Sequence, residues 1–498
     1  MRMACATRTG SRPGPWAGGR ARCAAALISL AALAPAARAA TSLPPQVLAA
    51  LQQAGVPAEA MSVAVVDTTH GRPLLAWQER RPLNPASLTK LLTTYAALDR
   101  LGPAWTWATP VWLAGPLKDG VLEGSLFIKG SGDPRLVLER LWLMLRRVQQ
   151  LGVREIRGDI VLDGSAFALP EAAPGDFDGE PLRPYNVRPA ALLFNFRSVL
   201  YGFVPDAAAG VARVAAEPAL DGTQVNASVP LTAGPCDDWR AALKASFEPG
   251  RTRFAGSYPA SCGEQTWAVA DPQPASYDAR LMATLWRGLG GVLHGVVREG
   301  PSPADARPSF ELRSPPLAEI VRDINKQSNN LMAQQLFLTL AREAAPNEAA
   351  TPDAARALLT RWLAQRTGGF GGGVSGQGDD LVIDNGSGLS RNTRISAQRL
   401  ARLLLQAWDS PVMSELMSSL PISGLDGTLR RSRAAPGRAH LKTGSLRDVA
   451  GVAGYVLTPN GRRLVVVAVV NHAQANAARP ALDALVQWTL RETPEFTR

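Results

Sequence analysis

The residues that predict an α/β domain lie at the two ends of this chain, and a long β-rich stretch separates them. Near the start, Met61–Asp67 is a mostly apolar run that predicts a buried strand, and residues 87–101 predict a helix buried along one face. Near the end, Arg463–Asn471 predicts a central strand. Helical and strand patterns at both ends, with β-rich patterns between them, fit one α/β domain that is interrupted by a long insertion.

The insertion itself contains two kinds of pattern. An amphipathic helical pattern at 136–151 lies between strand patterns at 124–129 and 155–162, which is typical of a β-α-β unit. Around this unit, short strand patterns alternate with Gly, Pro and Ser turns. The predicted division is therefore an α/β domain over 40–97 and 307–498, an inserted mainly β domain over 98–117 and 189–306, and a nested β-α-β domain over 118–188.

The first 39 residues have the pattern of a secretory signal peptide. They hold six Arg and no Asp or Glu, followed by an apolar run at 24–33 and an A-x-A site at 37–39. Cleavage is expected near Ala39 or Ala40, and a mitochondrial presequence is the alternative. The chain has 53 Lys plus Arg against 42 Asp plus Glu, a net charge of +11, which falls to +5 without the leader. Export and this modest charge argue against nucleic-acid binding.

Two cysteines remain after the leader. In an oxidising compartment, Cys236 and Cys262 favour one disulfide, and two free thiols are the alternative. No later stretch reaches the roughly 18 uninterrupted apolar residues of a spanning helix, so no transmembrane anchor is expected.

The sequence lacks the usual patterns of metal and nucleotide sites. The four histidines are scattered without an H-E-x-x-H frame, and no Cys or His lies at ligand spacing, so no metal is expected. Residues 368–378 are Gly-rich, but the chain contains no Gly-Lys dipeptide, which favours a surface loop over a phosphate-binding loop. We therefore expect no cofactor.

A serine and a lysine at the start of the helix at 87–101 could supply nucleophilic catalysis. Ser87 and Lys90 are three residues apart, so they share one face of the helix. The chain has no Gly-x-Ser-x-Gly motif that would indicate a Ser-His-Asp hydrolase. A partly desolvated Lys90 is therefore the natural base for Ser87.

Two further motifs follow along the chain. Ser328 and Asn330 follow the helical pattern at 317–327, so we expect them at a helix end or in a loop that joins two helices, where they supply a hydroxyl and an amide. Lys442-Thr443-Gly444 precedes an apolar run and predicts a strand edge, where a cation and a hydroxyl lie beside a glycine that lets a ligand approach closely. Such a strand edge is expected to bind the carboxylate of a ligand.

The order Ser-x-x-Lys, Ser-x-Asn and Lys-Thr-Gly is that of penicillin-binding proteins and serine β-lactamases. The 241 residues between Ser87 and Ser328 exceed what a small β-lactamase holds. The chain resembles the class C low-molecular-mass penicillin-binding proteins, the D-alanyl-D-alanine carboxypeptidase/endopeptidase family of serine DD-peptidases, which carry two extra domains between these motifs. The segments 129–134, 158–167, 314–330, 384–391, 420–429 and 441–446 also carry the resemblance. Asn385 and Gln334 depart from the family pattern.

The resemblance implies a multidomain α/β fold, in which a β-lactamase-like transpeptidase domain, a sheet flanked by helices, is interrupted by an insertion forming two smaller domains. It also implies a role for each motif residue. Ser87 is acylated, Lys90 is its base, Ser328 passes the proton to the leaving D-alanine and Asn330 orients the acyl amide. The terminal carboxylate binds Lys442 and Thr443 beside Gly444, and the backbone N–H groups of Ser87 and Ser445 form the oxyanion hole.

The implied function is that of a periplasmic serine DD-peptidase. Its substrates would be the D-alanyl-D-alanine termini or cross-links of peptidoglycan stem peptides, and β-lactams would be covalent inhibitors. A serine β-lactamase or esterase, and a catalytically weak cell-wall scaffold, are the alternatives. The sequence does not indicate whether carboxypeptidase or endopeptidase action dominates. It also does not indicate whether the chain forms a homodimer.

Overall fold

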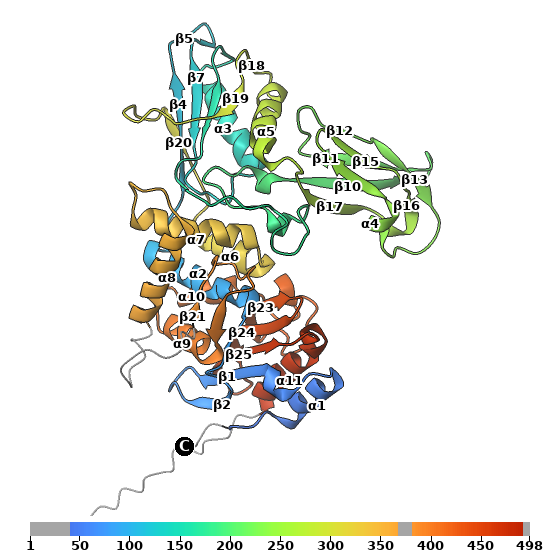
Figure 1. The fold of residues 1–498 in the computed structure, drawn as a ribbon, viewed down its shortest axis with the longest axis vertical. Coiled ribbons are helices and arrows are strands. Elements are labelled where there is room, and N and C mark those ends of the chain that lie inside the picture. The colour runs from blue at the N-terminus through green and yellow to red at the C-terminus, as the bar shows by residue number, and fades with distance from the viewer. Residues whose placement is uncertain (1–39, 367–380, 492–498) are drawn as a thin grey trace, which may run out of the picture. The chain divides into compact units, whose positions relative to one another are not determined.

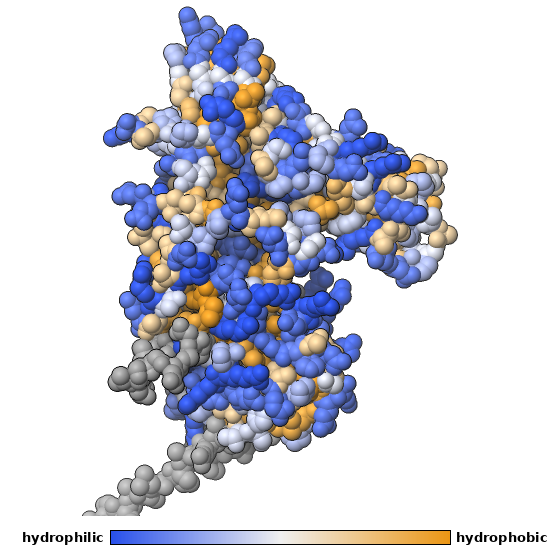
Figure 2. All heavy atoms as spheres, viewed as in Figure 1, coloured by the Kyte–Doolittle hydropathy of each residue, from blue (hydrophilic) through white to orange (hydrophobic). Residues whose placement is uncertain are grey.

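The computed structural model describes residues 40–366 and 381–491. The predicted leader at 1–39 and the predicted Gly-rich loop at 368–378 lie outside the described residues. Within the two described ranges, no helix is both long enough and apolar enough to cross a membrane. The face drawn in Figure 2 is mostly hydrophilic, and its hydrophobic residues form small separate groups.

A five-stranded antiparallel sheet joins the two ends of the described chain (Figure 1). Its order is β2-β1-β25-β24-β23, and β1 pairs with β25 along its whole length. The strands predicted over 61–67 and 463–471 are confirmed with the same bounds. The five strands are β1 (Met61–Asp67), β2 (Pro73–Trp77), β23 (Ala439–Leu446), β24 (Val449–Leu457) and β25 (Arg463–Asn471).

Helices cover both faces of this sheet. They are α1 (Pro45–Gln53), α2 (Thr89–Leu101), α6 (Leu317–Gln327), α7 (Asn330–Ala344), α8 (Pro352–Arg366), α9 (Ala397–Trp408), α10 (Met413–Ser419) and α11 (Arg479–Arg491). Along β25, Val465 and Val467 pack into the core that includes α2 and α9. The alternate residues Val466 and Val470 pack into the core that includes α1 and α11. A strand buried on both faces has no polar alternation, which explains the continuous apolar run.

A small three-stranded sheet is formed by short strands from distant parts of the chain. Its order is β21-β22-β3. It is formed by β3 (Pro82–Leu83), β21 (Leu381–Val382) and β22 (Arg394–Ser396), so it ties the residues just before Ser87 to a segment some 300 positions later.

Two sheets in the insertion draw strands from both sides of residues 118–188. Their orders are β19-β9-β7-β4-β20 and β18-β8-β6-β5. Parallel pairing of β19 with β9 and of β18 with β8 brings the later segment back to the nested unit. The elements are β4 (Ala108–Ala114), β5 (Leu117–Lys118), β6 (Val121–Leu122), β7 (Ser125–Lys129), α3 (Leu138–Gln150), β8 (Glu155–Ile156), β9 (Ile160–Asp163), α5 (Pro274–Gly288), β18 (Val292–Leu293), β19 (Val297–Glu299) and β20 (Phe310–Arg313).

The single strand predicted over 155–162 is wrong, because β8 and β9 are separate strands in different sheets. Between them, the Gly158 N–H donates to the Gly124 carbonyl. A Cβ at Gly158 would lie 2.4 Å from the Ser125 hydroxyl oxygen. The glycine therefore lets the chain pass closely from one sheet to the other.

A mainly β module follows in the insertion, with sheet orders β16-β13-β11-β10-β17 and β12-β15-β14. Cys236 and Cys262 form a disulfide in this module. Its elements are β10 (Ser198–Asp206), β11 (Val211–Glu217), β12 (Gln224–Val225), β13 (Ser228–Thr232), α4 (Trp239–Ala242), β14 (Ala245–Glu248), β15 (Arg251–Phe254), β16 (Tyr258–Pro259) and β17 (Gln265–Ala270).

Buried hydrogen bonds tie the insertion to α7. The Gln335 amide nitrogen donates to the carbonyls of Ala190, at 2.9 Å, and Gly132, at 3.3 Å, while its oxygen accepts from the Ala190 N–H at 3.0 Å. One turn later, Thr339 accepts from the Trp107 indole at 3.0 Å. Because a buried amide is costly to leave unpaired, these bonds hold α7 in a defined place against the insertion.

The disulfide leads to a first prediction. Replacing both Cys236 and Cys262 by Ser should lower the free energy of unfolding by roughly 3 kcal/mol, because the cross-link restricts a 26-residue loop of the unfolded chain. Urea denaturation of the chain without residues 1–39 measures this loss. The same protein, denatured without reductant, should titrate no free thiol, and two titratable thiols would contradict the pairing.

Candidate active site

The nucleophile candidate lies in a short turn that leads into α2. Ser87 is in the 3-10 helix η2 (Ala86–Leu88), and Lys90 is in the first turn of α2. The Lys90 Nζ atom is 3.0 Å from Ser87 Oγ. The sequence placed both residues at one helix start, and the structure brings their side chains into contact.

Asn84 holds this turn in an unusual backbone conformation. Ala86 has φ of +47°, a left-handed value that costs energy for a residue with a Cβ. Its N–H donates to Asn84 Oδ1 at 2.9 Å, and Asn84 Nδ2 donates to the Ser390 carbonyl at 2.9 Å. Asn84 was missed as a site residue. The sequence signal was present in the Asn-Pro dipeptide before Ser-x-x-Lys, which marks a turn.

Three oxygens surround the Lys90 amine, which is fully buried. Besides Ser87 Oγ, its Nζ atom is 2.6 Å from Asn330 Oδ1 and 2.6 Å from the Ser387 carbonyl oxygen. Burial, and then the positive charge of Lys442, hold the pKa of Lys90 well below its usual range. The site therefore favours a neutral Lys90.

The neutral amine has two N–H groups and one lone pair. The Asn330 oxygen and the Ser387 carbonyl can only accept, so they take the two N–H groups. The lone pair is then left for the Ser87 hydroxyl, which can donate its proton to Lys90. This is the arrangement that a general base requires before it activates a serine.

The second motif lies where one helix ends and the next begins, as its position after the helical pattern at 317–327 predicted. Ser328 ends α6 with φ of +56°, and the Asn329 side chain accepts from the Met332 N–H at 3.0 Å, which caps α7. Asn330 is therefore the first residue of α7. Capping by Asn329 starts this second helix directly after Ser328.

The third motif lies on β23, at the edge of the central sheet. Lys442 is fully buried, and its Nζ donates to Ser328 Oγ at 2.8 Å and to the Thr443 carbonyl at 2.9 Å. Burial lowers the pKa of Lys442 to about 7. A Cβ at Gly444 would lie 2.6 Å from the Pro85 carbonyl oxygen, so a glycine is required for β23 to lie this close to the nucleophile turn.

The loop at 384–391 completes the site, and its role was missed. Asn385 Oδ1 accepts from the N–H of Ser387 at 3.1 Å and from its hydroxyl at 2.9 Å, which holds the carbonyl that faces Lys90. Gln334 Nε2 lies 3.4 Å from the same hydroxyl. A Cβ at Gly388, which has φ of +80°, would lie 1.9 Å from the Ala86 carbonyl oxygen. Asn385 and Gln334, the two residues that depart from the family pattern, thus both contact Ser387.

The predicted residues therefore form one centre from distant parts of the chain. Ser87, Lys90 and Asn330 make one cluster, Ser328 and Lys442 make a second, and the Lys442 charge acts on Lys90. The disulfide is elsewhere, in the insertion.

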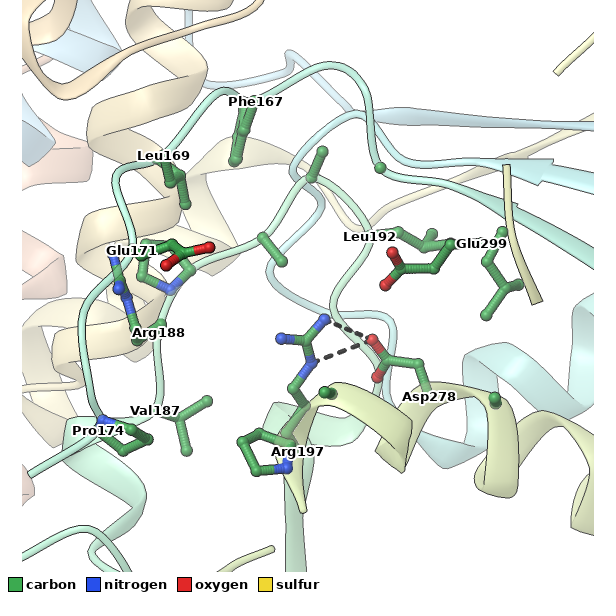
Figure 3. A pocket seen from close by; sticks show the side chains of 18 of the residues that line it. Phe167, Leu169, Glu171, Pro174, Val187, Arg188, Leu192, Arg197, Asp278 and Glu299 are labelled. Atoms are coloured by element: carbon green, nitrogen blue, oxygen red, sulfur yellow. Dashed lines mark hydrogen bonds and ion pairs between the residues drawn. The ribbon is translucent and has the colours of Figure 1, made fainter. Parts of the chain in front are cut away.

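A cavity of about 1320 Å³ lies in the insertion (Figure 3). Its wall includes Phe167, Leu192 and Glu299, together with the ion pair between Arg197 and Asp278, whose atoms are 2.6 Å apart. None of the predicted catalytic residues is among the described residues that line it. This cavity is thus separate from the serine and lysine cluster.

Comparisons with known proteins agree on one group. The D-Ala-D-Ala carboxypeptidase 3 (S13) family pattern matches residues 43–492. A D-alanyl-D-alanine carboxypeptidase from Actinomadura sp. is 30% identical over 487 residues, which is 92% of this chain and 87% of that protein. The crystal structure of penicillin binding protein 4 from Haemophilus influenzae matches with a TM-score of 0.70 and 22% identity, covering 90% and 98% of the two chains. The same relative, complexed with a β-lactam, matches with a TM-score of 0.66 and 21% identity, covering 90% and 99%.

Burial of Lys442 predicts a pH-dependent stability. The unfolded chain keeps its lysine protonated up to about pH 10.5, whereas folded Lys442 releases its proton near pH 7, so unfolding takes up a proton between these values. Raising the pH across this window should therefore stabilise the wild type relative to Lys442→Met, by at most about 1.4 kcal/mol per pH unit.

Urea denaturation at several pH values between 7 and 10 measures this difference. Lys118→Met is the matched control, because Lys118 is exposed. A stability difference between wild type and Lys442→Met that stays constant over the window would show that Lys442 titrates normally.

Proposed function

The chain belongs to the D-Ala-D-Ala carboxypeptidase 3 (S13) family, and from this membership we propose which residues carry out the reaction, on which substrate and in which compartment. The protein is a serine-type DD-carboxypeptidase. The observation that carries the assignment of residues is the 3.0 Å contact between Lys90 Nζ and Ser87 Oγ, with two pure acceptors on the other sides of the amine.

Acylation begins at Ser87. The lone pair of Lys90 accepts the hydroxyl proton while Ser87 Oγ attacks the carbonyl carbon between the two D-alanines. We assign the backbone N–H groups of Ser87 and Ser445 to the developing oxyanion. The close approach of Gly444 to the Pro85 carbonyl supports this assignment, because it places β23 directly against the turn that holds Ser87.

Ser328 protonates the leaving group. Its hydroxyl oxygen accepts from Lys442, so its own proton is free to pass to the departing D-alanine amine, and the Lys442 ammonium replaces that proton. Asn330 uses its oxygen for Lys90, which leaves its NH₂ group to donate to the acyl amide of the substrate. Water then attacks the ester on Ser87 and gives a proton to Lys442 through Ser328. Lys90 returns to Ser87 Oγ the proton that it took, which regenerates the enzyme.

The terminal carboxylate of the substrate is placed at β23. Lys442 offers a cation when protonated, and Thr443 offers a hydroxyl on the same strand. A β-lactam also carries a carboxylate beside its reactive carbonyl, so we propose that β-lactams acylate Ser87 in the same way. The β-lactam complex of the H. influenzae relative, a protein with this fold, supports this proposal.

We place the reaction in the periplasm, on peptidoglycan stem peptides. The Arg-rich leader with its apolar run and A-x-A site supports export. We further propose that residues 40–97 and 307–498 form the catalytic domain. The pairing of β1 with β25 supports this division, because it makes one sheet from the two segments.

A substitution at the nucleophile tests the assignment. Ser87→Ala should abolish both covalent labelling by benzylpenicillin and D-alanine release from a stem-peptide mimic, because no other atom of the cluster can form the ester. Intact mass spectrometry and peptide mapping locate the adduct. Ser228→Ala, at an exposed position on β13, is the control and should keep both activities. Labelling of Ser87→Ala at the wild-type rate would refute the assignment.

A further inference from the structure

Ser445 forms a hydrogen bond with an arginine that lies outside the three motifs. Ser445 is exposed on β23, two residues after Thr443. Its Oγ atom accepts from Nη2 of Arg479 at 2.9 Å. Arg479 is the first residue of α11, so the C-terminal helix supplies a cation beside the edge that we assign to the substrate carboxylate.

The direction of this hydrogen bond is fixed by chemistry. A guanidinium can only donate, so the Ser445 oxygen must accept and its own proton is free for a ligand. A hydroxyl that accepts from a cation is also a stronger donor. The Thr443 hydroxyl differs, because it lies 2.8 Å from the Thr428 hydroxyl and either atom could be the donor.

Asn476 fixes the position of Arg479. Its Nδ2 atom donates to the carbonyls of Leu446, at 3.0 Å, and Arg447, at 3.1 Å, at the end of β23. Its Oδ1 atom accepts from Arg479 Nη2 at 3.1 Å. The guanidinium is therefore anchored to the same strand end that carries Ser445.

Arg479 also adds a second cation at this end of β23. Burial lowers the pKa of Lys442 to about 7. Lys442 alone would therefore bind an anion less strongly as the pH rises above that value. An arginine stays protonated throughout this range. Both hydrogen-bond partners of Arg479, Ser445 and Asn476, are neutral. One turn along α11, burial raises the pKa of Asp483, and the Arg479 charge lowers it.

We propose that Arg479 is a positioning residue that determines specificity for a carboxylate-bearing ligand by holding the Ser445 hydroxyl as a donor to that carboxylate. This inference rests on the proposed function, because it places the ligand carboxylate along β23. It adds a residue from α11 to the recognition of the leaving end of the substrate.

Two ligands separate this role from general support of the fold. Benzylpenicillin presents a carboxylate, whereas phenylboronic acid adds to a serine hydroxyl without one. Acylation kinetics of Arg479→Gln with benzylpenicillin should show an initial binding constant weakened about tenfold, the cost of one charge-assisted hydrogen bond, with an unchanged first-order acylation step. The affinity for phenylboronic acid should not change. Arg479→Lys should recover part of the loss.

A double-mutant cycle tests the route through Ser445. Ser445→Ala should weaken benzylpenicillin binding, and adding Arg479→Gln to it should cause little further loss. Arg491→Gln, in the last turn of α11, is the control and should bind both ligands as the wild type does. Equal losses for both ligands, an unchanged benzylpenicillin constant, or fully additive losses would each overturn the inference. A wild type that benzylpenicillin does not acylate would instead overturn the proposed function.

Discussion

The burial of the Lys90 amine is the constraint on which the catalytic centre depends. A lysine removed from water is destabilised in its charged form, and the neutral form still needs partners for two N–H groups. The partners are Asn330 and the Ser387 carbonyl, which lie 240 and 297 residues away along the chain. The fold must therefore bring three distant segments together before Lys90 can act as the base that we propose.

The insertion contributes to this assembly although it holds none of the motif residues. It leaves the chain after α2 and returns before α6, and Gln335 joins it to α7 through a buried amide. Asn330 begins that same helix. The segments that interrupt the catalytic sheet thus help to hold the residue that orients Lys90. The cavity in the insertion is a separate feature, lined by an ion pair and by both apolar and charged side chains.

Sequence reasoning worked where one physical cause dominates a segment. Because β1 and β25 are buried on both faces, each is a run of apolar residues that predicts a strand. The three motifs could be identified because their hydroxyl, amine and amide side chains indicate the chemistry directly. It failed where side chains bond to the backbone. Asn84 and Asn385 shape the site through peptide groups, and such contacts have no periodic pattern. The left-handed residue at Ser328 was hidden in the same way, because the residues on both sides of it favour a helix.

The central claim is that Lys90 is a neutral base in the folded protein, kept so by burial and by Lys442. The most direct test is to titrate Lys90 by NMR, following its Cε and Nζ chemical shifts in lysine-labelled protein, with Lys90→Met used for assignment. We predict a midpoint well below 10.5 in the wild type and a higher midpoint in Lys442→Ala. A Lys90 that titrates near 10.5, the ordinary value for a lysine, would contradict the account.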